Sequence, residues 1–121
     1  MARILVIDDD SVSRLLLQRL LEQDGHDVTV VESGEAGVAH FREHRSDLVI
    51  TDLIMEGMSG LDVIQTLREE FRGVKIIGIS GGASDFPPVE RMRGANRVFS
   101  KPIDRDALLK TVREMVSPKD T

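Results

Sequence analysis

The sequence predicts an α/β fold with a doubly wound, five-stranded parallel sheet, and two patterns support this prediction. Short apolar runs recur along the chain, and runs of this kind are typical of strands buried inside a parallel sheet. Segments with helical periodicity separate them, and strands separated by helices favour right-handed parallel crossovers. The length of 121 residues suits one compact domain, so residues 1–121 are expected to form a single domain.

The chain begins with an expected strand and an expected helix. Arg3–Ile7 is a short apolar run that predicts the first strand. The first helix is expected over Ser11–Asp24, and Gly25 is a suitable residue to end it. The helical spacing is carried by Val12, Leu15, Leu16, Arg19 and Leu20.

Two further strands are expected on either side of the second helix. Asp27–Val31 is rich in β-branched residues and predicts the second strand. Ser33 is suited to cap a helix over Gly34–His44. Leu48–Thr51 is another apolar run and predicts the third strand.

A capping motif marks the third helix. Ser59 and Asp62 resemble a capping box, with Asp in place of the usual Glu, and predict a helix that ends near Phe71. Lys75–Ile79 predicts the fourth strand, and a glycine-rich loop follows from Ser80.

Prolines limit the fourth helix. Pro87 and Pro88 are compatible with the start of a helix but not with its interior, so a short helix ending near Arg93 is expected. Arg97–Phe99 predicts the fifth strand, and Asp104 is suited to cap a last helix. The apolar face of that helix comprises Leu108, Val112, Met115 and Val116.

Composition excludes several classes of protein. There is no cysteine, so disulfides and thiol catalysis are excluded and a reducing compartment is permitted. No apolar stretch approaches the ~20 residues that span a bilayer. The net charge of −5 argues against nucleic acid as a partner. A cytoplasmic location is expected, with neither a membrane nor a nucleic acid as partner.

Polar side chains gather where the predicted strands end. Asp8, Asp9, Asp52, Ser80 and Lys101 each lie at or just past a strand end. The strands of such a sheet end at the same edge, where open α/β folds bind ligands. Crowded carboxylates need a cation, and a hard divalent ion with oxygen ligands fits them best. Acidic groups, a hydroxyl and an ammonium group are together what phosphoryl transfer to a carboxylate requires.

From Arg3 to Val116 the sequence resembles the receiver domain of two-component response regulators. The resemblance implies a flavodoxin-like fold with strand order 2-1-3-4-5. It also implies phosphoryl transfer from a histidine kinase or a histidine phosphotransfer protein, and docking to a downstream protein that the sequence does not name. The matching residues are Ile7-Asp8-Asp9, Ile50-Thr51-Asp52, Gly60, Ser80-Gly81 and Lys101-Pro102.

The resemblance also implies roles for individual residues. Asp52 matches the phosphoacceptor, and Asp9 matches a direct ligand of Mg²⁺, with Mn²⁺ as a possible substitute. Asp8 matches the residue that holds a metal-bound water, and the backbone carbonyl of Ile54 matches the third metal-ligand position. The switch hydroxyl is matched by Ser80. The lysine that pairs with a phosphoryl oxygen is matched by Lys101.

Several positions depart from the receiver pattern. Glu56 stands where these domains commonly have proline. Val98 stands where an aromatic residue usually responds to phosphorylation, so we expect activation without an aromatic switch. Ile54 and Gly82 offer no polar side chain that could position an attacking water.

Two other functions are compatible with part of the sequence. The run Asp8-Asp9-Asp10 after an apolar strand also resembles the first motif of haloacid-dehalogenase-type phosphatases, with Asp8 as nucleophile and Asp10 as general acid. No acidic pair follows Lys101 to complete that site, and Asp52 would have no role in it. The other alternative is a docking module that is not phosphorylated.

Two remaining motifs are interpreted as surface features. His40 and His44 match an H-x-x-E-H metalloprotease motif, but no third ligand is apparent in the sequence. Arg91, Arg93 and Arg97 form a small basic cluster, which on an acidic domain favours a protein-contact or solvated surface.

Overall fold

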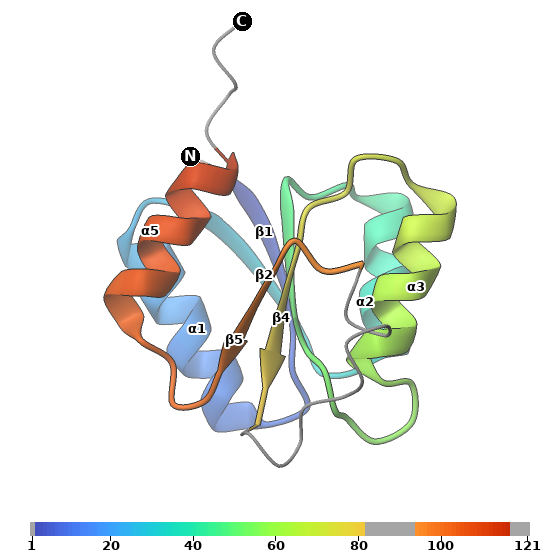
Figure 1. Cartoon of the computed structure of the whole chain (residues 1–121), viewed down its shortest axis with the longest axis horizontal. Helices are drawn as coiled ribbons and strands as arrows, with labels where there is room; N and C mark the ends of the chain where they lie inside the picture. The colour runs from blue at the N-terminus through green and yellow to red at the C-terminus, as the bar shows by residue number, and fades with distance from the viewer. Residues whose placement is uncertain (1, 82–93, 117–121) are drawn as a thin grey trace, which may run out of the picture.

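The computed structural model describes residues 2–81 and 94–116, whose strands form one parallel sheet in the order β2-β1-β3-β4-β5 (Figure 1). The predicted fold class and strand order are confirmed. The strands are β1 Arg3–Ile7, β2 Asp27–Val31, β3 Leu48–Asp52, β4 Ile76–Ser80 and β5 Arg97–Ser100. The helices are α1 Ser11–Gln23, α2 Gly34–Glu43, α3 Gly60–Glu70 and α5 Arg105–Val116.

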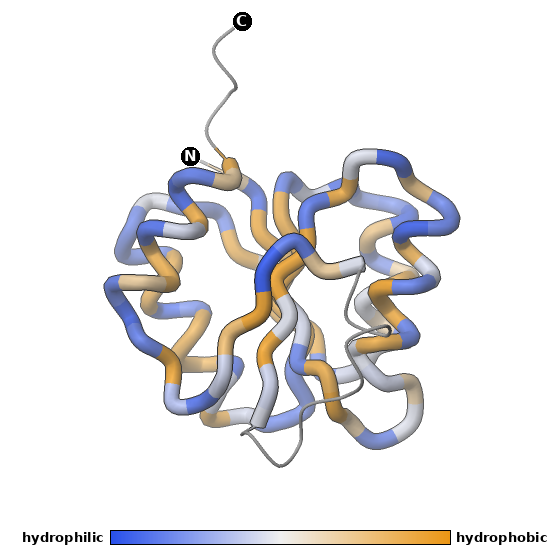
Figure 2. The backbone as a smooth tube through the Cα atoms, viewed as in Figure 1, coloured by the Kyte–Doolittle hydropathy of each residue, from blue (hydrophilic) through white to orange (hydrophobic). Residues whose placement is uncertain are grey.

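The helices cover both faces of the sheet (Figure 1). α1 and α5 pack on one face with the side chains of Ile4, Val6 and Ile50, and α2 and α3 pack on the other with Leu5 and Val49. Alternate residues of one strand therefore enter different cores, as the period of two in a strand requires. The central strands are apolar along most of their length (Figure 2), because both of their faces are covered.

Element boundaries differ slightly from the predicted ones. β3 continues to Asp52 rather than ending at Thr51, and β4 spans Ile76–Ser80 rather than Lys75–Ile79. β5 continues to Ser100. Polar residues at the strand ends still pair with their neighbours, which an apolar run alone does not reveal. The short fourth helix predicted to end near Arg93 lies outside the described residues.

Three predicted helix caps are present. The Ser33 hydroxyl accepts a hydrogen bond from the Ala36 amide at 3.1 Å. Ser59 and Asp62 form the reciprocal capping box, with bonds of 3.2 and 3.3 Å. The Asp104 carboxylate accepts from the Ala107 amide at 3.2 Å. Each cap satisfies an amide that the first turn of a helix leaves free, so the short motifs located these helix starts correctly.

Most of the apolar residues that predict α1 are exposed, and of them only Leu20 packs partly against the core. Val12, Leu15 and Leu16 are 63%, 47% and 64% exposed, whereas Leu17 and Leu21 pack in the core. α1 has apolar residues on two sides, and helical periodicity does not tell which side meets the sheet. The structure therefore leaves an apolar strip on the surface, formed by Val12, Leu15 and Leu16, which we call the α1 strip.

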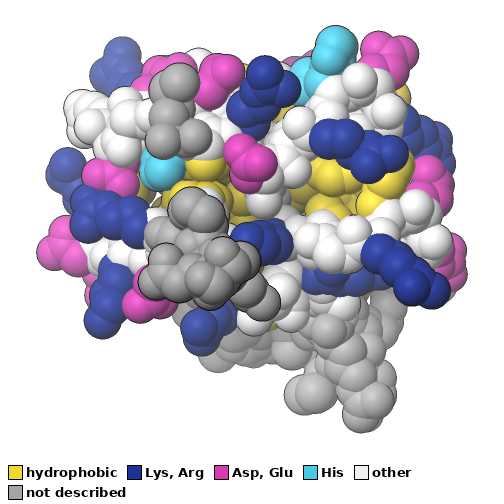
Figure 3. Space-filling view, turned by 90° about the horizontal axis from the view of Figure 1, so that it is seen from above, with side chains coloured by type: hydrophobic (Ala, Val, Ile, Leu, Met, Phe, Trp, Pro, Cys, Tyr) yellow, Lys and Arg dark blue, Asp and Glu magenta, His cyan; other side chains and the backbone are white. Residues whose placement is uncertain are grey.

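Bidentate ion pairs join the helices in each layer. The Arg113 guanidinium of α5 donates to the Asp24 carboxylate at the end of α1, at 2.8 and 2.6 Å. Arg42 of α2 pairs with Glu70 of α3. Charged residues of both signs are interspersed on the face seen in Figure 3, which is the end of the molecule where the strands begin. Among the described residues, no helix combines the length and hydropathy needed to cross a membrane.

Candidate functional site

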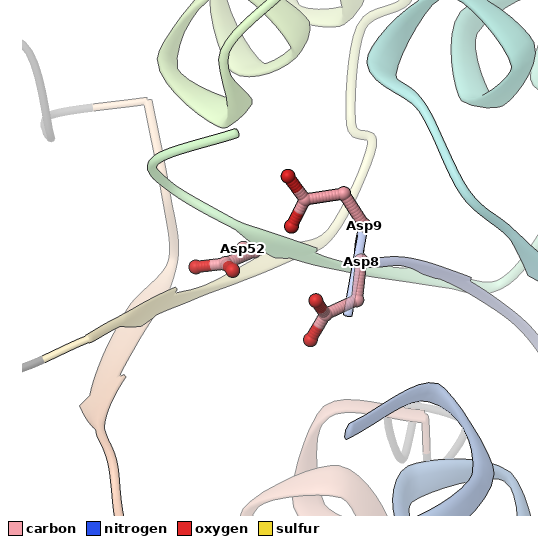
Figure 4. Close-up of side chains that lie close together, drawn as sticks. All are labelled: Asp8, Asp9 and Asp52. Carbon is pink, nitrogen blue, oxygen red and sulfur yellow. The ribbon is translucent and has the colours of Figure 1, made fainter. Parts of the chain in front are cut away.

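Three carboxylates converge at the edge of the sheet where the strands end. Asp8 and Asp9 follow β1, and Asp52 is the last residue of β3. Each offers a carboxylate oxygen, and these oxygens lie within 4.8 Å of one another. Figure 4 shows the side chains extending from the ends of the two strands toward the same space. The register pairs Ile7 with Thr51, which brings Asp8 beside Asp52 although 44 positions separate them in the sequence.

Lys101 supplies positive charge to this cluster. It follows β5 directly, and its Nζ lies 3.7 Å from Asp8 Oδ2 and 3.6 Å from Asp52 Oδ2. The ammonium group thus contacts both buried carboxylates, while Asp9 is exposed. The sequence predicted that these four side chains would meet, and the structure brings them together.

Burial raises the pKa of Asp8 and Asp52 above the ordinary value of 3.8, because desolvation disfavours a charged carboxylate. For Asp8, the hydrogen bond from the Asp10 backbone amide and the positive charge of Lys101 lower the pKa and so oppose this shift. For Asp52 the charge of Lys101 opposes the shift, and the neighbouring carboxylates reinforce it. One ammonium therefore does not fully offset the two buried acids.

Asp10 stabilises the acidic turn, which is formed by Asp8, Asp9 and Asp10. Its backbone N–H donates to Asp8 Oδ1 at 2.9 Å, and its own carboxylate caps α1 through the Ser13 amide at 3.0 Å. Sequence reasoning missed this cap, although Asp directly before a helix is its usual form. A carboxylate engaged as a helix cap is a poor candidate for the general acid of the phosphatase alternative.

Gly60 allows the backbone of Asp52 to lie against the start of α3. A Cβ atom at this position would lie 1.8 Å from the Asp52 carbonyl oxygen, which no side chain can tolerate. The Gly60 amide also donates to the Leu53 carbonyl at 3.0 Å. The packing of one glycine therefore fixes the backbone that carries the Asp52 carboxylate.

The remaining predicted residues lie around the cluster. Ser80 is the last residue of β4 and is fully buried, and its carbonyl accepts from the Lys101 amide at 2.9 Å. Ile54 lies two residues past Asp52 with its side chain 52% exposed. Gly81 is exposed and Gly82 lies outside the described residues. Val98 is partly buried and packs against the core beneath α2 and α3.

A hydrogen bond that the sequence did not predict joins the loop after β1 to the loop after β3. The Glu56 amide donates to Asp9 Oδ2 at 3.3 Å. A proline here would have no N–H and could not make this bond. The departure from the receiver pattern at this position therefore adds a contact between the loop after β1 and the loop after β3.

The donor set suits a hard divalent cation. Carboxylate oxygens are the ligands that Mg²⁺ and Mn²⁺ prefer. Asp8 Oδ2 is buried and accepts no hydrogen bond from the described residues, and its contact is the ammonium of Lys101 at 3.7 Å. A buried carboxylate oxygen left in that state has capacity for a further partner, such as a metal-bound water.

Comparison with known proteins identifies the family. Residues 4–113 match the response regulator receiver domain. The chain belongs to this family. The receiver is 32% identical over 120 residues to protein PilH of Pseudomonas aeruginosa, covering 97% of this chain and 99% of PilH. It is also 34% identical to the autoinducer sensor kinase/phosphatase CqsS of Vibrio cholerae, covering 94% of this chain but only 17% of CqsS.

A solved structure supports the same assignment. The receiver superimposes with a TM-score of 0.88 on response regulator TrrA of Thermotoga maritima, whose structure contains Mg²⁺ and beryllofluoride. The two chains are 31% identical, and the match covers 95% of this receiver and 99% of TrrA. The predicted family is confirmed, and the phosphatase alternative is not favoured.

The structure describes the histidine motif and one residue of the basic cluster. The rings of His40, on α2, and His44, the residue that follows the end of α2, lie 5.3 Å apart. The only group of three metal-ligating side chains found among residues 2–81 and 94–116 is that of Asp8, Asp9 and Asp52. Arg97 is exposed at the start of β5, whereas Arg91 and Arg93 lie outside the described residues.

Proposed function

We propose that Asp52 accepts a phosphoryl group from a phosphohistidine carried by a histidine kinase or a histidine phosphotransfer protein. The observation that carries this proposal is the meeting of Asp8, Asp9 and Asp52 with Lys101 at one sheet edge. Asp52 is the proposed acceptor because it ends a central strand and matches the phosphoacceptor position of receiver domains, with Lys101 3.6 Å from its Oδ2. The relative CqsS, a sensor kinase/phosphatase, supports a kinase as the source of the phosphoryl group.

The proposed cofactor is Mg²⁺, and Mn²⁺ would suit the same oxygen donors. Asp9, Asp52 and the backbone carbonyl of Ile54 are the proposed direct ligands, and Asp8 would act through a bound water. The buried Asp8 Oδ2, which accepts no hydrogen bond from the described residues, and the Mg²⁺ in TrrA support this assignment. When bound, the ion would neutralise charge on the phosphoryl oxygens.

The transfer itself forms one bond and breaks one bond. A carboxylate oxygen of Asp52 attacks phosphorus, the new O–P bond forms, and the N–P bond breaks in line with it. The electron pair of that bond returns to the donor imidazole, which takes up a proton. Lys101 pairs with a phosphoryl oxygen and thereby stabilises the charge spread over the phosphoryl group. Ser80 donates to another oxygen, which requires the buried end of β4 to adjust.

The surface beside the site suits a protein donor. The α1 strip begins two residues past Asp10, and the exposed side chain of Ile54 lies two residues past Asp52. Between α1 and the start of α5 lies a recess of about 550 Å³, lined on its apolar side by Leu16, Leu20 and Ile103. Exposed apolar side chains around a polar site are typical of interaction surfaces. We propose that the phosphodonor protein contacts the α1 strip.

Residues 1–121 are proposed to act as one receiver domain that signals by docking a downstream protein or by passing the phosphoryl group onward. Such a domain is a signalling module rather than a dedicated enzyme. Because its proposed donor draws phosphate from ATP, the cytoplasm is the proposed compartment.

Phosphorylation with a small donor tests the function. Incubation with acetyl phosphate and Mg²⁺ should add one phosphoryl group, located by mass spectrometry on Asp52 and absent in Asp52→Asn. Asp47→Asn, an exposed position before β3, is the matched control and should be labelled normally. Phosphate on Asp8 would instead support the phosphatase-like chemistry. Failure of any label to form would support a docking module that is not phosphorylated.

A further inference from the structure

Arg14 reaches back from α1 to the acidic turn. It lies in the first turn of the helix, where its backbone N–H donates to the Asp10 carbonyl at 3.0 Å. Its guanidinium Nη1 donates to the backbone carbonyl of Asp8 at 2.8 Å, and Nη2 lies 3.8 Å from Glu32 Oε2. Only 20% of the side chain is exposed. This long cation is therefore held against the turn rather than extended into solvent.

The contact completes a set of bonds that fixes Asp8. The Asp8 N–H donates to the Val31 carbonyl at 3.2 Å, and Asp8 Oδ1 accepts from the Asp10 amide at 2.9 Å. With Arg14 on its carbonyl, the amide, carbonyl and carboxylate of this residue are all engaged. The three bonds come from β2, from the turn itself and from α1. Together they determine where the second oxygen, Oδ2, points.

We infer that Arg14 is a positioning residue for the metal site: by holding the Asp8 carbonyl it orients the carboxylates of Asp8 and Asp9. This inference rests on the proposed function, since it assumes that these carboxylates bind a divalent ion. Arg14 donates to a main-chain oxygen and acts through Asp8, so it is not a catalytic residue. The planar guanidinium presents Nη1 to the carbonyl and Nη2 to Glu32 in a fixed geometry, which an ammonium on a flexible stem does not reproduce.

The expected effect is a loss of metal affinity. Removal of a group that orients metal ligands typically lowers affinity about 10- to 100-fold. Arg14→Ala should therefore weaken Mg²⁺ binding by at least about tenfold. Arg14→Lys keeps the charge and one donor and should recover part of the loss. Glu32→Gln should change affinity less than Arg14→Ala, because the bond to the Asp8 carbonyl remains.

A matched control lies on the same helix. Arg19 carries the same charge on α1, is exposed, and lines the recess between α1 and α5 rather than the acidic turn. Arg19→Ala should leave Mg²⁺ affinity unchanged. The chain contains no Trp and no Tyr, so calorimetric titration suits it better than intrinsic fluorescence. The melting temperature without Mg²⁺, measured in parallel, separates a loss of affinity from a loss of fold.

The outcomes separate this inference from the proposed function. Mg²⁺ binding by the wild type, with at least tenfold weaker binding by Arg14→Ala and none of this loss in Arg19→Ala, supports the positioning role. Equal affinities of Arg14→Ala and wild type overturn it and leave the function intact. Failure of the wild type to bind Mg²⁺ overturns the function instead. If Arg14→Ala does not fold, wild-type affinity in both Arg14→Lys and Arg14→Gln overturns the inference.

Discussion

The negative charge of Asp52 destabilises the folded protein when no metal ion is bound. Its pKa is raised by burial, so folding favours the protonated form. The resulting destabilisation is fully present at pH values well above the raised pKa. It declines as the pH falls through that pKa toward the ordinary value of 3.8, below which both states are protonated. The charge of Asp52, the proposed acceptor, is thus expected to lower the stability of the metal-free protein at neutral pH.

Asp52→Asn should therefore stabilise the metal-free protein at neutral pH. We expect a gain of roughly 0.5–2 kcal/mol, the range typical of a single stabilising substitution. The gain should shrink as the pH is lowered and should also shrink when Mg²⁺ is added, because both relieve the charge in the wild type. Thermal unfolding with and without Mg²⁺ over a pH series measures this. Glu114→Gln removes an exposed carboxylate of α5 and serves as control; an equal gain there would contradict the explanation.

Substitutions of Glu56 test the hydrogen bond between its backbone amide and Asp9. Glu56→Gln removes the side-chain charge and keeps the amide that donates to Asp9, whereas Glu56→Pro removes both. We expect Glu56→Pro to weaken Mg²⁺ binding more than Glu56→Gln does. A single hydrogen bond is worth about 0.5–1.5 kcal/mol, so the difference should be roughly 2- to 10-fold. Equal Mg²⁺ affinities of the two variants, measured by calorimetry, would show that the hydrogen bond from the Glu56 amide to Asp9 has no effect on the site.

The start of α3 is the element most closely tied to the acceptor. Gly60→Ala would force a methyl group onto the Asp52 carbonyl, so we expect destabilisation of about 1–3 kcal/mol or more and weaker acetyl-phosphate labelling. Gly73→Ala is the matched control, because Gly73 has a φ of +78° and open space around it. It should cost about 1 kcal/mol of backbone strain and leave labelling of the folded protein intact. Normal labelling and stability of Gly60→Ala would refute the packing argument.

The two sides of α1 should respond differently to the same substitution. Leu16→Ser changes an exposed residue of the α1 strip, so it should leave the melting temperature nearly unchanged and lower the rate of phosphotransfer from a protein donor. Labelling by acetyl phosphate should be unaffected. Leu17→Ser changes a buried residue and should cost roughly 2–5 kcal/mol. Normal transfer from the protein donor to Leu16→Ser would remove the α1 strip from the proposed contact surface.

The same helix shows what the sequence could and could not predict. Periodicity located α1 correctly, but its burial depends on how the helix meets the sheet, so Leu16 was not distinguished from Leu17. The cluster around Asp52 was predictable because the topology sends every strand end to one edge. The contacts between loops were not predictable: neither the Glu56 amide on Asp9 nor the Arg14 guanidinium on Asp8 follows from a spacing or a motif.

On the scale of the whole molecule, the two ends of the sheet are held differently. Arg113 and Asp24 join α5 to the end of α1, and Arg42 and Glu70 join the late turns of α2 and α3. These bidentate pairs lie at the end opposite the acidic cluster. At the cluster end, contacts are made by turns, by the ends of strands and by the first turns of α1 and α3. We therefore expect phosphorylation to change the cluster end and leave the other end largely as it is.

Amide hydrogen exchange with and without beryllofluoride and Mg²⁺ tests this expectation. Protection changes should concentrate in Ser80–Pro88 and the segment that follows, because Ser80 would donate to the phosphoryl mimic. The last turns of α1 and α5 should change little. Val98 has no ring to reorient, so β5 should not dominate the response. Changes confined to β5, with the loop after Ser80 silent, would show that the expectation is wrong.

The pairing of Ile7 with Thr51 has a consequence for how the protein matures. Asp8 and Asp52 become neighbours only when two strands from distant parts of the chain have joined in this register. A slip of one residue would turn the side chains of β1 to the opposite face of the sheet and separate the acids. A chain that is collapsed but mispaired therefore has no acceptor pocket. Only a correctly folded chain can therefore be phosphorylated at the proposed site, and a misfolded copy would transmit no signal.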